Sequence, residues 1–212
     1  MTITEFFRLL NIPLLPSVNY PYIFILSTYY INIYQFSTLT HPYSLSKTLQ
    51  VLIAQSWEVL YNMHIIIAKP SNLIGPGFSN GVCSIFAKKI IDMEKNKAEK
   101  ILQATNLNAQ RDFLDVRDAV SAYDMLLIQG NSGETYEIAS GTSRSLGEVT
   151  HCFKSLAKME FEIISLTTGG KEQQIKILSS KLRNLGWKPT IPFESSLRNM
   201  LNFYRKNEKN KN

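Results

Sequence analysis

Residues 64–77 read HIIIAKPSNLIGPG, a short apolar run that passes into a loop rich in proline and glycine. An apolar run of this length, stopped by a proline, is typical of a strand that is buried on both faces. The preceding residues 43–61 carry leucines at helical spacing, which predicts a long helix with one apolar face. The stretch therefore predicts a helix that leads into a buried strand over residues 64–68, followed by a loop over residues 72–81.

Regular segments continue after this loop. We expect helices over residues 82–95, 116–129 and 146–158, and a strand over residues 135–139. Ser145 is the expected cap of the last helix, because a serine side chain satisfies a free N–H in the first turn. The alternation of helices and strands predicts α/β architecture with a parallel sheet.

Charge is concentrated at the C-terminus. The chain has 212 residues, of which 44% are hydrophobic, and a formal net charge of +6. Residues 198–212 hold five lysines and arginines against one glutamate, or +4, so the rest of the chain is close to balanced. No basic stripe interleaved with aromatic residues appears elsewhere. We therefore interpret residues 205–212 as a disordered basic tail and expect no nucleic-acid partner.

The metal-binding residue types are scattered. Cys83 and Cys152 lie far apart in the sequence, and the three histidines have no paired spacing. This pattern argues against a disulfide scaffold and against a zinc site. We expect no metal and a reducing, cytoplasmic setting.

The N-terminal segment has a different composition. Residues 9–40 contain no charged residue, which raises the possibility of a membrane span. Prolines and asparagines interrupt the segment, and its cleanest apolar run, residues 22–34, is shorter than the ~20 residues that a spanning helix needs. We favour one strand around residues 22–26 and treat residues 1–36 as an atypical apolar segment, either part of the fold or foreign to it.

Tyr43 and Lys47 form the first candidate catalytic pair. A separation of four residues places both side chains on one face of a helix. A phenol titrates near 10, so bringing its pKa towards neutrality requires about 4 kcal/mol, part of which an adjacent ammonium supplies. The spacing suits a tyrosine that donates a proton beside a lysine, although a surface pair on the first helical turn would look the same.

The surrounding motifs are more specific. The sequence HPYSLSK at residues 41–47, a helix, and then AKPSN and GPG within residues 68–77 resemble the extended short-chain dehydrogenase/reductase family, also called the NAD-dependent epimerase/dehydratase family. That family carries a Pro-Tyr-x-x-Ser-Lys helix, a buried strand that ends in Arg-Pro-x-Asn, and a Gly-Pro-Gly loop. Lys69 stands where the family usually has an arginine.

The resemblance covers about residues 37–204 and extends through residues 106–118, 133–141 and 185–189. It implies a partial Rossmann-like parallel sheet without its N-terminal strands, together with the C-terminal substrate-binding lobe. The sequence NAQRDFLDVRD at residues 108–118 is most similar to the corresponding sequence in reductases of GDP-4-keto-6-deoxy-D-mannose. GDP-mannose 4,6-dehydratases and nucleotide-sugar epimerases remain alternatives.

The resemblance also implies roles for individual residues. Tyr43 would protonate the sugar C4 oxygen as hydride arrives from NAD(P), and Lys47 would bind the nicotinamide ribose and lower the Tyr43 pKa. Pro70 would lie at the cofactor. The cofactor itself is expected on the strength of the resemblance alone.

Three residues would hold the GDP-sugar substrate. Asn72 would contact the substrate, and Lys89 and Arg111 would bind its diphosphate. Two alternatives stay open. Arg111 can instead form a surface salt bridge with Asp112 or Asp115, and Lys89 can lie on a solvated helix face.

One family feature is missing from this sequence. The family binds the cofactor pyrophosphate at a Gly-x-x-Gly-x-x-Gly turn, whereas all ten glycines of this chain follow residue 74. Only 42 residues precede Tyr43, which is too few for the strands and helices that normally come first. We therefore expect an N-terminally truncated chain with doubtful NAD(P) binding that is inactive alone.

Further expectations follow from this gap. Ser17, Ser27 and Thr28 are all imperfect candidates for the family's catalytic serine or threonine, and residues 166–177 contain no arginine for clamping a nucleotide. The chain could form a homodimer or pair with a full-length homologue, since relatives often dimerise through the Tyr-x-x-x-Lys helix. A non-catalytic binding or assembly fragment is the alternative of another class. An incomplete sheet would also expose an apolar edge and lower solubility.

Overall fold

The computed structural model describes residues 22–25, 42–167, 170, 173–174 and 176–207, and for residues 22–25, 43 and 44 it describes the backbone alone. The central strand of the first sheet is β2 (Ile65–Pro70), which lies between β1 (Tyr22–Ile25) and β6 (Thr135–Ile138) and is parallel to both. The expected α/β architecture with a parallel sheet is confirmed.

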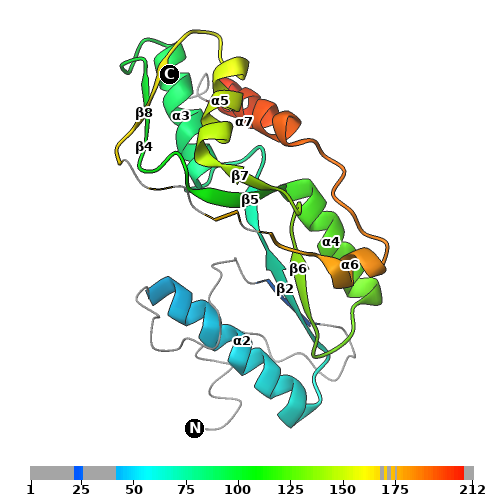
Figure 1. The fold of residues 1–212 in the computed structure, drawn as a ribbon. Coiled ribbons are helices and arrows are strands. Elements are labelled where there is room, and N and C mark those ends of the chain that lie inside the picture. The colour runs from blue at the N-terminus through cyan, green and yellow to red at the C-terminus, as the bar shows by residue number, and fades with distance from the viewer. Residues whose placement is uncertain (1–21, 26–41, 168–169, 171–172, 175, 208–212) are drawn as a thin grey trace.

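Helices cover both faces of β2. Ile65 and Ile67 pack with Ala54 of α2 (Pro42–Tyr61) on one face. Ile66 and Ala68 pack with α4 (Val116–Gln129) on the other. Figure 1 shows α2 and α4 on either side of the strands. The prediction of a strand buried on both faces is confirmed, because side chains of alternate residues point to opposite faces.

Two boundaries around this strand differ from expectation. Pro70 was expected to stop the strand, yet it is the last residue of β2, opposite Ile138 of β6. A proline is tolerated at a strand end, where the N–H of the next residue, Ser71, can continue the ladder to the Ile138 carbonyl. The expected loop over residues 72–81 begins instead with a short strand, β3 (Asn72–Ile74).

β3 belongs to a second sheet that joins the two halves of the fold. It runs parallel to β5 (Gln110–Asp115), which pairs antiparallel with β7 (Ser143–Ser145). In Figure 1 this sheet lies between α2 and β2 at one end of the molecule and a helical lobe at the other. Neither β5 nor β7 is predicted by the local sequence pattern.

The helical lobe has its own core. It contains α3 (Val82–Glu94), α5 (Leu146–Leu156) and α7 (Phe193–Asn207), with the parallel pair β4 (Ile101–Ala104) and β8 (Glu162–Ser165) beside them. Ile90, Phe153 and Leu197, one from each helix, are fully buried together. The expected helices over residues 82–95 and 146–158 are confirmed, each ending slightly earlier than predicted.

The last helix corrects one expectation. α7 continues to Asn207, so Arg205 to Asn207 are helical rather than part of a disordered tail. The Arg205 guanidinium is mostly buried and donates hydrogen bonds to the Glu94 carboxylate of α3. A charged partner that is distant in sequence therefore holds this end, which local composition could not indicate.

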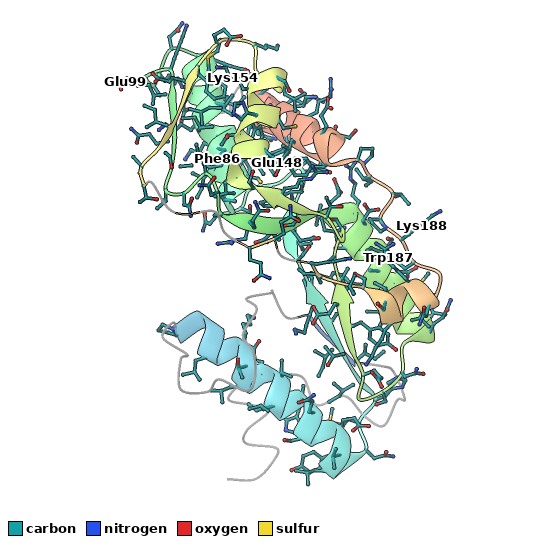
Figure 2. The ribbon with its side chains drawn as sticks, in the orientation of Figure 1. Phe86, Glu99, Glu148, Lys154, Trp187 and Lys188 are labelled. Carbon is teal, nitrogen blue, oxygen red and sulfur yellow. The ribbon has the colours of Figure 1, made fainter. Side chains whose placement is uncertain are left out.

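Trp187, in the segment after α6 (Ser180–Asn184), binds this segment to α4. Its indole N–H donates to the Asp118 carbonyl and to the Ser121 hydroxyl. Figure 2 shows Trp187 directed towards α4. The Asp118 carboxylate of the same helix accepts hydrogen bonds from the backbone N–H and the hydroxyl of Thr190. Within the part of the chain that the structure describes, no helix is long and apolar enough to cross a membrane.

Candidate functional site

A cavity of about 390 Å³ lies where β2 ends and β3 begins. Lys47 of α2, Pro70 of β2 and Asn72 of β3 all line it, and the start of α3 completes the wall. The carboxyl ends of parallel strands are the usual position of ligand sites in α/β proteins. The structure therefore brings three sequence-predicted site residues together, and we call this space the central cavity.

Lys47 enters the cavity from the second turn of α2. Its Nζ also donates a hydrogen bond of 3.1 Å to the Gln50 side chain. Tyr43 lies one turn earlier in the same helix, but its side chain is outside the described residues. The pairing of the two side chains thus stays a prediction. The candidates Ser17, Ser27 and Thr28 are also outside the described residues.

Asn72 is held by the neighbouring strand. Its position in β3 is opposite Phe113 of β5, and its Nδ2 donates a 2.9 Å hydrogen bond to the Asp112 carbonyl. This bond orients the amide at the cavity wall. The adjacent Ser71 hydroxyl is buried in the same wall, and the described residues provide it with no hydrogen-bond partner.

Arg111 lies in β5, half-buried, on the same face of the second sheet as Asn72. Its Nη1 donates to the Gln110 carbonyl at 2.6 Å. The two acids named as alternative partners are engaged elsewhere. Asp115 forms a two-point ion pair with Arg117, whereas Asp112 binds a backbone loop.

Asp112 is a residue that sequence reasoning missed. It is 1% exposed, and its carboxylate accepts four hydrogen bonds from the loop at residues 140–142. Its carbonyl accepts the bond from Asn72. One residue therefore fixes both the loop at residues 140–142 and the Asn72 amide. An aspartate inside a stretch of strand-forming residues was the available signal.

Lys89 lies outside the central cavity. It lines a neighbouring cavity of about 580 Å³ together with Lys88, Phe78 and Tyr204. The two cavities share Ser79 and Ser84, whose hydroxyl oxygens are 2.7 Å apart. The structure therefore places Lys89 next to the predicted site and separates it from Asn72 by this serine pair.

A third cavity of about 250 Å³ adjoins the central one on its other side, since both are lined by Ile74 and Phe113. Arg144 of β7 and Phe193 of α7 contribute to its wall. Arg144 was not among the residues predicted from the sequence. Its position opposite Arg111 follows from the pairing of β7 with β5.

Of the charged side chains that line this third cavity, Asp115 is paired with Arg117. Burial would raise the pKa of the Asp115 carboxyl, but hydrogen bonds from Arg117 and Ser196 outweigh burial, and the pKa lies below its ordinary value. Asp115 is therefore an anion in the folded chain at neutral pH. Lys69 forms an ion pair of 2.8 Å with Glu137 on the adjacent strand β6.

No cluster of three or more histidine, cysteine, aspartate or glutamate side chains suited to a metal ion occurs among the described residues. Both cysteines are free thiols, and burial raises the pKa of Cys83 far above its usual range. The described side chains that line the three cavities carry ammonium, guanidinium, amide, hydroxyl, carboxyl and thiol groups.

Comparisons with known proteins agree on one family. The model of the NAD dependent epimerase/dehydratase family matches residues 29–139. The GDP-6-deoxy-D-mannose reductase of Pseudomonas aeruginosa is 30% identical over 166 residues, which are 76% of this chain and 55% of that protein. The dTDP-glucose 4,6-dehydratase of Salmonella typhimurium is 30% identical over 182 residues, 78% of this chain and 48% of that protein.

Solved structures show the same similarity. A structure of RMD from Pseudomonas aeruginosa complexed with NADPH has a TM-score of 0.78 and 26% identity, and the match covers 90% of this chain and 68% of that one. A dTDP-glucose 4,6-dehydratase from Bacillus anthracis in complex with NAD has a TM-score of 0.65 and 27% identity, covering 80% of this chain and 54% of that one. The chain spans about half the length of the curated relatives it matches.

Proposed function

Because the chain belongs to the NAD dependent epimerase/dehydratase family, a family of sugar-nucleotide enzymes, we propose that its central cavity is the substrate-side part of a reductase site for a GDP-linked 4-keto-6-deoxy sugar. One observation carries the proposal: Lys47, Pro70 and Asn72, which come from three elements, line the same cavity at the carboxyl end of β2. The relative GDP-6-deoxy-D-mannose reductase supports the choice of substrate class.

In this proposal Tyr43 gives its phenolic proton to the sugar C4 oxygen. Lys47, one helical turn later, holds an ammonium beside the phenol and so favours the phenolate that remains. The Lys47–Gln50 bond of 3.1 Å keeps the ammonium at the cavity wall. The proton thus moves from Tyr43 to the substrate oxygen, and Lys47 stabilises the charge that this leaves behind.

The substrate is held by groups on both sides of the serine pair. Asn72, oriented by the Asp112 carbonyl, hydrogen-bonds the sugar end. Arg111 and Lys89 supply positive charge for the diphosphate. An extended sugar nucleotide can reach from the central cavity into the neighbouring one, because the two adjoin at Ser79 and Ser84.

The described residues fit the nicotinamide end of a dinucleotide. The buried Ser71 hydroxyl has no hydrogen-bond partner among them and lies beside Pro70, so it can bind a carboxamide or ribose group. When bound, the nicotinamide supplies the hydride for the reduction. The sequence contains no glycine-rich turn for the pyrophosphate. We therefore propose that the chain alone binds the sugar nucleotide and fails to complete the redox reaction.

Calorimetry with the purified chain tests the binding part of this proposal. We expect the chain to bind GDP. Asn72→Ala should weaken binding of a GDP-linked sugar by about tenfold and leave the affinity for GDP nearly unchanged, because the amide contacts the sugar end. An exposed asparagine outside the cavities, Asn131→Ala, is the matched control. Equal affinity of wild-type chain and Asn72→Ala for the GDP-linked sugar would contradict the assignment.

A separate assay tests the redox part. We expect no oxidation of NADPH by the chain with a 4-keto sugar nucleotide. If the chain does oxidise NADPH, the proton-donor role requires that Tyr43→Phe abolishes this reaction without weakening GDP binding. Turnover by the wild-type chain would show that it binds the cofactor without the glycine-rich turn.

The second candidate is a dehydratase relative that acts on a dTDP-linked sugar, favoured by the 30% identity to the Salmonella typhimurium dehydratase. Competition between GDP and dTDP separates the two. Preference for dTDP would favour the dehydratase. Binding of neither nucleotide, together with capture of a full-length family member, would favour a non-catalytic assembly fragment.

A further inference from the structure

The neighbouring cavity of about 580 Å³ carries charged groups that the fold itself does not use. The end of α7, the loop before α3 and α3 itself line this cavity, and Figure 1 shows both helices in the helical lobe. Lys88, Lys89 and Asp92 lie in its wall. None of these three side chains forms an ion pair or a hydrogen bond with another residue that the structure describes. They are therefore available to a ligand.

Positions along α3 give this cavity a direction. Ser84, which also borders the central cavity, is followed on one face of the helix by Lys88 and then by Asp92. Each interval of four residues corresponds to about 6 Å of rise along the helix. In a sugar nucleotide the diphosphate likewise lies between the sugar and the nucleoside. With the sugar at Asn72 and the diphosphate near the lysines, the nucleoside lies towards Asp92.

Phe78 offers an aromatic surface in the wall of the same cavity. Its side chain is 68% exposed. Its ring is nevertheless held by edge contacts, with centroid distances of 5.0 Å to Phe203 and 5.7 Å to Tyr204. A side chain that is already fixed loses little further freedom when a ligand binds. Nucleobases stack on such rings because every base has a π face.

The half-buried Asp92 carboxylate distinguishes one base from another. An ionised carboxylate accepts hydrogen bonds and cannot donate them. Guanine presents the adjacent donors N1–H and N2–H₂, which match two carboxylate oxygens. Thymine presents a single N–H between two carbonyl oxygens, and adenine places an acceptor nitrogen beside its amino group. Of these three bases, guanine therefore fits the carboxylate best.

We propose that Phe78 and Asp92 determine the base specificity of this cavity, Phe78 by stacking on the base and Asp92 by accepting the N1–H and N2–H of guanine. This inference deepens the proposed function and rests on it for the direction in which the sugar nucleotide lies. The ligand chemistry that the two residues require is that of a guanine nucleotide, whatever sugar is attached.

Calorimetric titration of the purified chain with GDP, inosine diphosphate and inorganic pyrophosphate tests the inference. Inosine diphosphate lacks only the 2-amino group, so the wild-type chain should bind GDP about tenfold more tightly. Asp92→Asn should reduce this preference to about twofold or less, because its amide turns an NH₂ group towards a donor of the base. Phe78→Ala should weaken both nucleotides by about tenfold and leave pyrophosphate unchanged. Asp124→Asn makes the same change at an exposed position of α4 and is the control.

Equal affinity of the wild-type chain for GDP and inosine diphosphate would overturn the inference, and so would the absence of nucleotide binding. A preference that survives Asp92→Asn, or that Asp124→Asn removes equally, would also overturn it. If Phe78→Ala does not fold, as judged by its thermal transition, Phe78→Leu keeps an apolar side chain beside Tyr204 but removes the ring, and carries the same expectation.

The Asn72→Ala titration separates this inference from the proposed function. Guanine selectivity that depends on Asp92, with no effect of Asn72→Ala on a GDP-linked sugar, would uphold the inference and refute the proposed function. A GDP-linked sugar that is weakened by Asn72→Ala, with no loss of guanine selectivity in Asp92→Asn, would refute the inference alone.

Discussion

Three buried aspartates each bind a neighbouring segment through several hydrogen bonds. The Asp112 carboxylate accepts four hydrogen bonds from residues 140–142, and the Asp115 carboxylate accepts hydrogen bonds from Arg117 and Ser196. Asp118 does the same for Thr190 and the backbone that follows it. Each of these side chains is 1–3% exposed. Because a buried carboxylate is costly unless donors surround it, each one fixes the segment that supplies its donors.

Asp112→Asn tests this role at the residue scale. The amide keeps the shape of the side chain but turns an NH₂ group towards backbone N–H donors, so we expect a loss of about 1–3 kcal/mol in the free energy of unfolding. Displacement of Asn72 should also weaken binding of a GDP-linked sugar by about tenfold, as Asn72→Ala is expected to do. Asp124→Asn, at an exposed position of α4, is the control. A destabilised variant with wild-type affinity for the GDP-linked sugar would show that Asp112 supports the fold without positioning Asn72.

At the scale of elements, helix ends are where local sequence and structure agree best. Ser145 caps α5 through a capping box, in which its hydroxyl accepts the Glu148 N–H and the Glu148 carboxylate accepts the Ser145 N–H. Asp115 caps α4 in a similar way by accepting the Arg117 N–H. These bonds join residues two or three positions apart, so a short sequence window contains both partners.

Ser145→Ala should therefore destabilise the chain by about 1 kcal/mol, because it leaves a first-turn N–H of α5 without its acceptor. Ser155→Ala, in an exposed position of the same helix, is the matched control. Urea unfolding of the two variants measures the difference. Equal midpoints for both would mean that the α5 cap contributes nothing to global stability.

α2 presents an unusual outer surface for a helix. Its inner side packs on Ile65 and Ile67 through Ala54, while Val59 is 77% exposed and Leu60 is 69% exposed. Large exposed apolar patches favour association. We expect Val59→Glu to raise the soluble fraction and to lower the apparent mass in light scattering. In the wild-type chain Ile128 of α4 is 74% exposed, and Ile128→Glu should have a smaller effect. An equal effect would show that the exposed surface of α2 is not the cause of association.

At the scale of the whole molecule, one ion pair ties the C-terminal helix to the lobe. Burial would raise the pKa of the Glu94 carboxyl, but hydrogen bonds from Arg205 and from the Lys158 N–H lower it further than burial raises it. A carboxyl whose pKa is lowered by folding stabilises the chain above its unfolded pKa, about 4.3 for a glutamate. This contribution is lost as the pH falls through the lower, folded pKa.

The free energy of unfolding should therefore decline with acidification below about pH 4, and Glu94→Gln should show a shallower decline. Denaturant unfolding across a pH series measures both slopes. Glu162→Gln, at an exposed position of β8, should keep the wild-type slope. Identical slopes for wild type and Glu94→Gln would exclude this pair as a source of acid sensitivity.

The sequence by itself determined the elements whose information is local. The apolar run of β2 and the serine cap of α5 each lie within one short window, and both predictions are confirmed. The leucine spacing also predicted the α2 helix, although the leucines themselves, such as Leu45 and Leu49, are exposed. The motifs also identified the family and nominated Lys47, Pro70 and Asn72, which the fold brings into one cavity.

Tertiary structure alone decided the rest, because the deciding contacts join residues distant in the sequence. β5 and β7 meet only when the chain closes about 30 residues back on itself, and that register places Arg144 opposite Arg111. Lys89 is separated from Asn72 by the packing of the loop onto α3. Arg205 is ordered by Glu94, 111 positions away. Periodicity and composition contain no record of such pairings, since each partner is ordinary in its own local context.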